Sequence, residues 1–231
     1  MNARPPVAVT VDVVILTVHL GRLQALLVTR AQDPFRDRLA IPGGFVDADE
    51  DLPVAAVREL EEETGVTGVR VEQLRTYGAP GRDPRPERVV SVAHLAVLPE
   101  PVAVRGGDDA SYAGWYDVAE VLTHPERLAF DHAEILGDAV EEVRSRLERT
   151  SLATSFVGEV FSLSELRGVY EAVWGRPLDP GNFQRKVRQT EELVVATGET
   201  RLSPTGKGRP AALYRAARPG VHDLNVPITR G

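Results

Sequence analysis

Stretches of apolar, β-branched residues alternate along this chain with stretches whose apolar residues recur every three or four positions. Runs of the first kind predict β-strands, at residues 7–18, 23–29, 69–76, 89–98 and 112–116. The helical period is clearest over His132–Leu147, with Ile135, Leu136, Ala139, Val143 and Leu147 on one stripe. Strands with interspersed helices predict an α/β or α+β domain over residues 1–150.

The pattern changes near residues 150–156, and a second module is predicted over residues 151–231. Ser162 and Glu165 have the spacing of a capping box, which begins a helix, and Gly175 ends that helix. The apolar stripe of the helix consists of Leu163, Leu166, Val169, Tyr170 and Val173. This first helix is therefore expected to pack one face against the rest of the module.

A second helix and a hairpin are predicted to follow. Asp179 precedes a proline, which is the pattern of a helix start, and the helix runs near residues 181–190. Phe183 and Val187 lie one turn apart and are expected to be its buried anchors. The two hairpin strands are predicted at residues 193–197 and 212–215.

Helix, short turn, basic second helix and basic hairpin tip describe a winged helix-turn-helix, whose second helix enters the major groove. The predicted contacts to phosphates and bases are Arg185, Lys186, Arg188, Lys207 and Arg209. The alternative is a helical cap or dimerisation arm whose basic residues are simply solvated.

An acidic helix is predicted in the first half, beginning near Asp51 and ending at Gly65. Its predicted buried stripe is Leu52, Ala56, Val57 and Leu60. Glu59, Glu62 and Glu63 stand at i, i+3 and i+4 and share another face, where their charges repel. A hard cation such as Mg²⁺ or Mn²⁺ prefers carboxylate oxygens and bridges to phosphates, so this face predicts a metal site. The alternative is a solvated acidic face.

Composition and charge narrow the class of protein. The 231 residues are 42% hydrophobic, with apolar runs no longer than a strand, so we expect no membrane span. The N-terminal residues lack the features of a signal peptide, and there is no cysteine, which favours a cytoplasmic protein. The net charge is −7, yet residues 151–231 carry eleven Lys or Arg against eight Asp or Glu, or +3. This asymmetry suggests two modules with different partners.

The acidic helix and its flanks resemble the signature of the Nudix family, G-x5-E-x7-R-E-U-x-E-E-x-G-U, where U is aliphatic. Every fixed position is present: Gly44, Glu50, Arg58, Glu59, Leu60, Glu62, Glu63, Gly65 and Val66. The resemblance implies an α/β/α sandwich that binds a nucleoside diphosphate linked to another moiety. It implies metal binding by Glu59, Glu62 and Glu63, and catalysis by Glu62, Glu63 and Arg58, with Arg58 orienting the glutamates. Glu50 is expected to support the loop or a further metal, and Gly43, Gly44 and Glu50 are predicted ligand contacts.

A second resemblance covers nearly the whole chain. Residues 161–187 and 206–215 look like the winged-helix domain of the Nudix-related transcriptional regulators (the NrtR family). Residues 128–136 resemble the same regulators, and Arg82-Asp83-Pro84-Arg85 resembles a motif shared with ADP-ribose pyrophosphatases. The resemblance implies an α+β chain that acts as a dimeric repressor of NAD-metabolism genes. Such a repressor binds double-stranded DNA at a palindromic operator and is released by ADP-ribose.

Whether the chain is also an enzyme stays open from the sequence. Many regulators of this kind have a degraded Nudix box, but this box is complete, so hydrolysis of ADP-ribose to AMP and ribose 5-phosphate is a second expectation. The candidate proton acceptors are Glu62, Glu63, Asp108 and Asp109, although the last two equally suit a solvated turn. Arg82 and Arg85 are candidate ligand contacts, or part of an exposed loop. The alternative function is a metal-dependent pyrophosphatase whose C-terminal domain serves assembly only.

Overall fold

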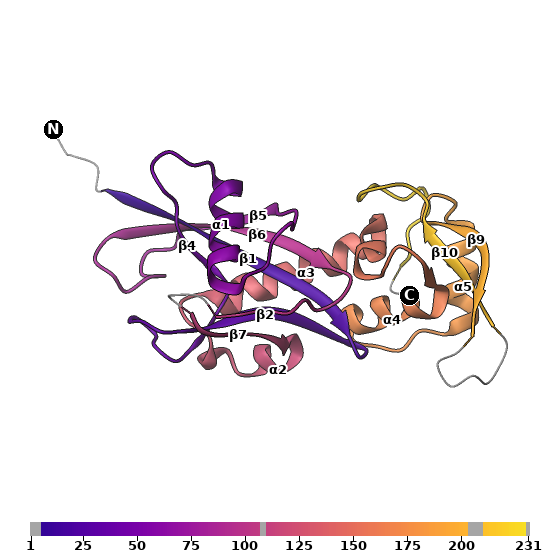
Figure 1. The fold of residues 1–231 in the computed structure, drawn as a ribbon, viewed down its shortest axis with the longest axis horizontal. Helices are drawn as coiled ribbons and strands as arrows, with labels where there is room; N and C mark the ends of the chain where they lie inside the picture. Colours follow the sequence, from indigo (N-terminus) through magenta and orange to yellow (C-terminus); the bar gives the residue numbers. More distant parts are fainter. Residues whose placement is uncertain (1–5, 107–109, 203–209, 230–231) are drawn as a thin grey trace. The chain divides into compact units, whose positions relative to one another are not determined.

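A computed structural model describes residues 6–106, 110–202 and 210–229 of the chain (Figure 1). Two compact units divide these residues. The first comprises residues 1–16, 24–96 and 102–139, and the second comprises residues 17–23, 97–101 and 140–231. The domain boundary expected at residue 150 stays a prediction. None of the helices within the described ranges combines the length and the apolar character that crossing a membrane requires.

A seven-stranded sheet forms the centre of the first unit. Its strands are β1 (Val7–His19), β2 (Arg22–Arg30), β3 (Leu39–Ala40), β4 (Gly43–Phe45), β5 (Glu72–Tyr77), β6 (Arg88–Leu98) and β7 (Ala110–Asp117). The order is β3-β2-β1-β6-β5, with β4 paired to β1 and β7 paired to β2. All five strands predicted from the apolar runs are present, with small shifts of their ends. The short pairing of β4 with β1 places Gly43 opposite Asp12.

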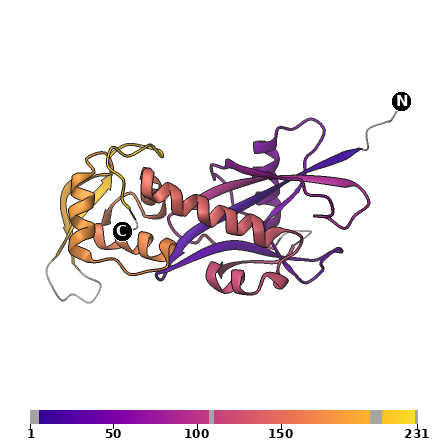
Figure 2. The same cartoon turned by 180° about the vertical axis from the view of Figure 1, so that it is seen from behind.

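Helices α1 (Leu52–Thr64), α2 (Val118–Thr123) and α3 (His132–Arg149) accompany this sheet, together with the 3₁₀ helix η1 (Pro125–Arg127). Helix α1 packs against β4 and β7. Helix α3 lies behind the strands in Figure 1 and in front of them in Figure 2. All five apolar positions predicted on α3 are buried. The sheet with its helices confirms the fold predicted for this part of the chain.

Helix α1 has the predicted ends but a slightly different buried face. Asp51 Oδ1 accepts a hydrogen bond from the Leu52 backbone N–H, and Gly65 ends the helix with a φ of 72°. The buried positions are Ala55, Ala56, Leu60 and Thr64. Leu52 and Val57, which we predicted in the stripe, are only half-buried. Compared with the prediction, the buried face of the helix is shifted toward Thr64. The Thr64 hydroxyl can be buried because it donates to the Leu60 carbonyl.

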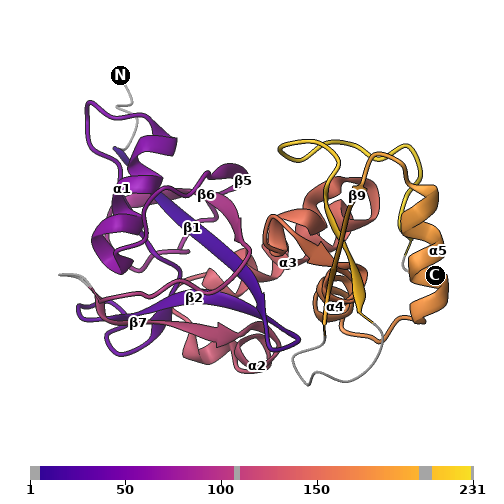
Figure 3. The same cartoon turned by 45° about the vertical axis from the view of Figure 1, so that its right-hand side comes forward.

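The second unit contains a helix pair and a three-stranded sheet (Figure 3). Its elements are η2 (Ser151–Phe156), β8 (Phe161–Ser162), α4 (Leu163–Trp174), α5 (Pro180–Gln189), β9 (Val194–Arg201) and β10 (Ala211–Ala216). Both hydrogen bonds of the predicted capping box are present at the start of α4. Helix α4 packs against α5 and β10. Phe183 and Val187 of α5 are buried as predicted, so this part is the winged helix-turn-helix expected from the sequence.

Residues 219–229 form a C-terminal extension within the second unit. Ile228 is buried, and its backbone N–H donates to the Glu148 carbonyl at 2.9 Å. Thr190 at the end of α5 donates through its hydroxyl to the Val226 carbonyl at 3.2 Å. The extension therefore holds the end of α3 and the end of α5, a role that the sequence pattern did not indicate.

Candidate functional site

A cavity of about 830 Å³ lies in the first unit. Eight of the nine residues predicted for the Nudix site line it: Gly43, Gly44, Arg58, Glu59, Glu62, Glu63, Arg82 and Arg85. The ninth, Glu50, forms an ion pair with Arg58, which lines the cavity. Residues from β1, β2, β4, α1 and two loops thus meet at one place, although they are distant in the sequence.

Arg58 connects the carboxylates of the Nudix box. Its guanidinium hydrogen bonds to both oxygens of Glu50, to Glu59 Oε1 at 2.8 Å and to Glu62 Oε2 at 3.2 Å. It also donates to the Phe45 carbonyl at 3.1 Å. The hydrogen bond from Arg58 lowers the pKa of Glu50. Arg58 therefore offsets the repulsion between the glutamates and fixes their positions, which is the orienting role that the Nudix resemblance implied.

Glu59 and Glu63 are the desolvated carboxylates of the cavity. Burial raises the pKa of Glu59, and the hydrogen bond from Arg58 only partly opposes this shift. Burial raises the pKa of Glu63 to about 8, although the Gly43 backbone N–H donates to its Oε2 at 3.0 Å. Two buried carboxylates with too little positive charge around them fit a hard divalent cation, which would favour their ionised forms.

The carboxylates are nevertheless not arranged as a finished metal site. Over the part of the chain that the structure describes, no three His, Cys, Asp or Glu side chains are grouped closely enough to hold an ion. The reason is local, because Arg58 engages Glu59 and Glu62 while Gly43 engages Glu63. Binding one ion by all three glutamates therefore requires their carboxylates to move closer together.

Glycine is required at positions 43 and 44 by close contacts. A Cβ on Gly43 would lie 2.1 Å from the Val11 carbonyl oxygen, so a side chain would separate β4 from β1. A Cβ on Gly44 would lie 2.4 Å from all three carboxyl atoms of Glu59. Gly43 therefore lets β4 pair closely with β1, and Gly44, the first residue of the box, leaves space for the Glu59 carboxylate.

The two arginines of the Arg-Asp-Pro-Arg motif line the cavity but already have acidic partners. Arg82 is almost fully buried and donates to Asp131 through Nε at 2.8 Å and Nη2 at 2.6 Å. Arg85 forms a fork with Asp83 and lies 4.8 Å from the centre of the Phe45 ring. Both arginines therefore line the cavity with their side chains already paired, and their role as ligand contacts stays a prediction.

Among the polar residues of this cavity that sequence reasoning missed, Asp12 and His132 are buried. Asp12 lies in β1, where it accepts a hydrogen bond from Ser91 and lies 3.4 Å from His132 Nε2. His132 Nδ1 accepts a hydrogen bond from the Ile41 backbone N–H at 2.9 Å. Burial lowers the pKa of His132. Because Nδ1 accepts a hydrogen bond, it carries no proton, and the proton of the ring lies on Nε2. An aspartate inside an otherwise apolar strand was the signal that could have identified Asp12.

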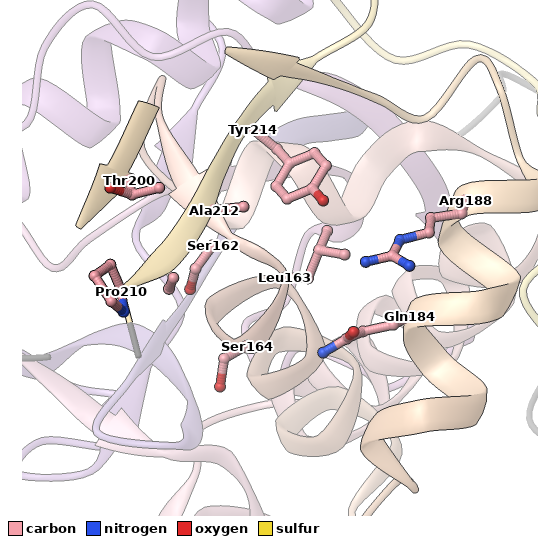
Figure 4. A pocket seen from close by; sticks show the side chains of 10 residues that line it. Ser162, Leu163, Ser164, Gln184, Arg188, Thr200, Pro210, Ala212 and Tyr214 are labelled. Atoms are coloured by element: carbon pink, nitrogen blue, oxygen red, sulfur yellow. The ribbon is translucent and has the colours of Figure 1, made fainter. Parts of the chain in front are cut away.

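A second cavity, of about 570 Å³, lies in the second unit between the start of α4, α5 and the hairpin. Figure 4 shows Gln184 and Arg188 reaching into it from α5, toward Leu163 and Tyr214. Neither Gln184 nor Arg188 has a hydrogen-bond or ion-pair partner among the described residues. An exposed arginine and amide beside a hairpin suit recognition of nucleic acid.

The other predicted DNA contacts have different surroundings. Arg185 is exposed and donates to Asn182 Oδ1 at 3.4 Å. Lys186 is half-buried, and its ammonium donates to the backbone oxygen and the hydroxyl of Thr229 at 3.2 and 3.0 Å. Lys207 and Arg209 lie outside the described residues, as do the candidate proton acceptors Asp108 and Asp109.

Comparisons with known proteins match both units. Residues 6–138 match the NUDIX domain family, and residues 153–216 match the NrtR DNA-binding winged helix domain. The chain is 34% identical over 225 residues to the ADPR responsive transcriptional repressor NtrR of Acinetobacter baylyi. That alignment covers 96% of this chain and 87% of the relative.

Two solved structures are similar to this one. Shewanella oneidensis NrtR complexed with a 27mer DNA has 32% identity and a TM-score of 0.77, covering 96% of this chain and 99% of that chain. The NUDIX domain of the same NrtR complexed with ADP ribose has 36% identity and a TM-score of 0.56. It covers 62% of this chain and 94% of that chain.

Proposed function

This chain belongs to the Nudix-related transcriptional regulators, the NrtR family, and on that premise we propose that it is an ADP-ribose-responsive transcriptional repressor. It binds a palindromic operator of NAD-metabolism genes as a dimer, and ADP-ribose releases it. The observation that carries this proposal is the presence in one chain of a Nudix cavity and a winged helix with an exposed basic face.

The DNA-binding part of the proposal rests on α5. Gln184, Arg185 and Arg188 share its exposed face, while Phe183 and Val187 fix the helix from the buried side. Arginine and glutamine are side chains that read base edges in the major groove. A dimer presents two such helices, which is why a palindromic operator is expected.

The ligand-binding part rests on the first cavity. A diphosphate needs positive donors and a cation, and the cavity offers Arg82 and Arg85 beside the carboxylates of α1. Its volume of about 830 Å³ is in the range of sites for small molecules. The relatives named above respond to or bind ADP-ribose, and we extend that ligand to this chain.

Nudix hydrolases use divalent metal ions, and we propose Mg²⁺ or Mn²⁺ on Glu59, Glu62 and Glu63. The ion, when bound, neutralises charge on the diphosphate. Arg58 holds the carboxylate of Glu59 by a hydrogen bond, and the Gly43 N–H holds that of Glu63. Glu50 contributes indirectly, because it holds Arg58.

Hydrolysis of ADP-ribose is the second candidate function, and the complete box with its desolvated Glu63 favours it. The oxygen of a water molecule attacks one phosphorus of the diphosphate, and the bond from that phosphorus to the bridging oxygen breaks. Glu62 or Glu63 accepts the proton of the water, and the products are AMP and ribose 5-phosphate. In this case the protein would consume its own signal.

Fluorescence anisotropy with a labelled palindrome, obtained by selection from random DNA with the wild-type chain, tests the proposal. Arg185→Ala and Arg188→Ala should each weaken operator binding about tenfold, since a specific arginine contact is worth about 1–3 kcal/mol. Both should leave ADP-ribose binding unchanged. Arg127→Ala removes a surface arginine of the first unit and is the control. Unchanged operator affinity in both α5 variants would exclude α5 as the reading helix.

A further inference from the structure

Three consecutive residues at the start of α3, Phe130 to His132, each hold a different group of the first cavity. Phe130 has a φ of 49°, and its ring lies 4.9 Å from the guanidinium of Arg30 and 5.8 Å from that of Arg85. A phenylalanine rarely adopts this left-handed backbone conformation, which indicates that its surroundings fix it there. We call residues 130–132 the sensor segment.

Asp131 is the member of the sensor segment that joins the cavity to the helix. Its carboxylate forms the bidentate pair with Arg82, whose side chain is only 4% exposed. Its carbonyl accepts the backbone N–H groups of Glu134 at 2.9 Å and Ile135 at 3.1 Å, the first hydrogen bonds of α3. A movement of Asp131 therefore changes the first turn of α3.

His132 completes the connection on the other side. Its Nδ1 accepts from Ile41 N–H, two residues before Gly43, and its Nε2 faces Asp12. Ile41, Asp12 and Gly43 all line the same cavity as the glutamates. The sensor segment thus contacts the arginines of the cavity and, through His132, the strand end that leads into Gly43.

The charges around Arg82 make this arrangement sensitive to an anionic ligand. One buried guanidinium already faces the carboxylate of Asp131 and, at 3.8 Å, that of Asp12. A diphosphate entering the cavity adds further negative charge next to the same guanidinium, in a place that is poorly screened. The ligand and Asp131 therefore compete for Arg82, and binding weakens the attachment of Asp131.

We propose that the sensor segment changes its conformation when a ligand fills the first cavity, with Asp131 as its positioning residue. This inference rests on the proposed function, because it assigns the mechanism by which ADP-ribose alters operator binding. Occupancy of the cavity draws Arg82 toward the diphosphate, and the first turn of α3 rearranges. Helix α3 ends at Arg149, next to the winged-helix module in the chain, so the change enters that module through the backbone.

The test compares Asp131→Asn with Asp138→Asn. Asp138 lies within α3 and also pairs with an arginine, Arg75 at 2.6 Å, but Arg75 does not line the cavity. Operator affinity is measured with and without a methylene-bridged analogue of ADP-ribose that cannot be hydrolysed, and analogue affinity is measured by calorimetry. The ratio of the two operator dissociation constants is the coupling factor, typically about 5–150 in allosteric proteins.

Asp131→Asn removes the competing charge, so the analogue should bind about tenfold more tightly while the coupling factor falls to about 1. Asp138→Asn should keep the wild-type value of both. A damaged fold would weaken analogue binding. Tighter binding together with lost coupling therefore shows that Asp131 transmits ligand binding and does not merely support the fold. A coupling factor in Asp131→Asn equal to that of the wild type would overturn the inference while leaving the proposed function intact.

Two further results complete the test. If the wild-type coupling factor is itself about 1, the proposed function fails and the inference fails with it. If Asp131→Asn does not fold, hydrogen–deuterium exchange on the wild-type chain decides. The amides of Glu134 and Ile135 should exchange faster when the analogue is bound, while those of α2 keep their rates. Unchanged exchange at Glu134 and Ile135 would overturn the inference.

Discussion

Glu63→Gln should make the first unit more stable while abolishing any hydrolysis. Burial raises the pKa of Glu63 to about 8, from 4.5 for an ordinary glutamate. Between these two values the folded protein keeps a proton that the unfolded chain releases. The contribution of Glu63 to stability is therefore complete below the unfolded pKa and is lost as the pH rises through the folded pKa.

The loss in free energy of unfolding grows with the number of pH units by which the pH exceeds the unfolded pKa. Each unit corresponds to about 1.4 kcal/mol, so about 3 kcal/mol of the stability of the wild type is lost by about pH 7. Glutamine cannot ionise, and its amide oxygen can still accept the Gly43 N–H. The variant should therefore match the wild type near about pH 4.5 and exceed it in free energy of unfolding at about pH 7.

Urea unfolding at about pH 5 and about pH 7, in the presence of a chelator, measures this difference. The chain has two tryptophans, so a Trp174→Phe background leaves Trp115 as the fluorescent reporter of the first unit. Glu61→Gln is the control, because Glu61 is exposed on the same helix and does not line the cavity. If the stability of Glu63→Gln relative to the wild type is the same at both pH values, the account of Glu63 as a desolvated carboxylate is wrong.

Three other variants give independent checks. Gly44→Ala places a methyl group against the Glu59 carboxylate, so calorimetry should show ADP-ribose binding weakened about tenfold or more, at a cost of about 1–3 kcal/mol; unchanged binding would refute the close contact. Arg188→Ala should cost more operator affinity in anisotropy titrations than Lys186→Ala, because the Lys186 ammonium is already held by the C-terminal extension. Tyr170→Phe removes a buried hydroxyl without a partner among the described residues, so urea unfolding should show a gain of about 1 kcal/mol.

The helices could be predicted because their start and stop signals are local. The capping box of Ser162 and Glu165 and the left-handed Gly65 and Gly175 lie within a few residues of the ends they define. The Nudix box was recognisable for the same reason, since its glutamates and Arg58 lie within one helix and its flanks. Prediction from sequence succeeds where the interaction and the signal share one short segment.

The contacts that organise the cavity connect distant segments, and no local pattern revealed them. Asp131 lies 49 residues from Arg82, and His132 lies 91 residues from Ile41, so neither pair could be inferred from spacing. The surroundings of Lys186 also depend on a distant segment of the chain. Its place on α5 suggested a solvent-facing charge, but the C-terminal extension folds back and binds its ammonium.

The most direct test of the central claim is an anisotropy titration of the wild-type chain on its selected palindrome, with and without ADP-ribose. The account predicts that saturating ADP-ribose raises the operator dissociation constant. It also predicts that saturating operator weakens ADP-ribose binding by the same factor, because coupling between two sites is reciprocal. Operator affinity that stays constant while calorimetry shows the cavity filled with ADP-ribose would contradict the claim that this chain is a ligand-controlled repressor.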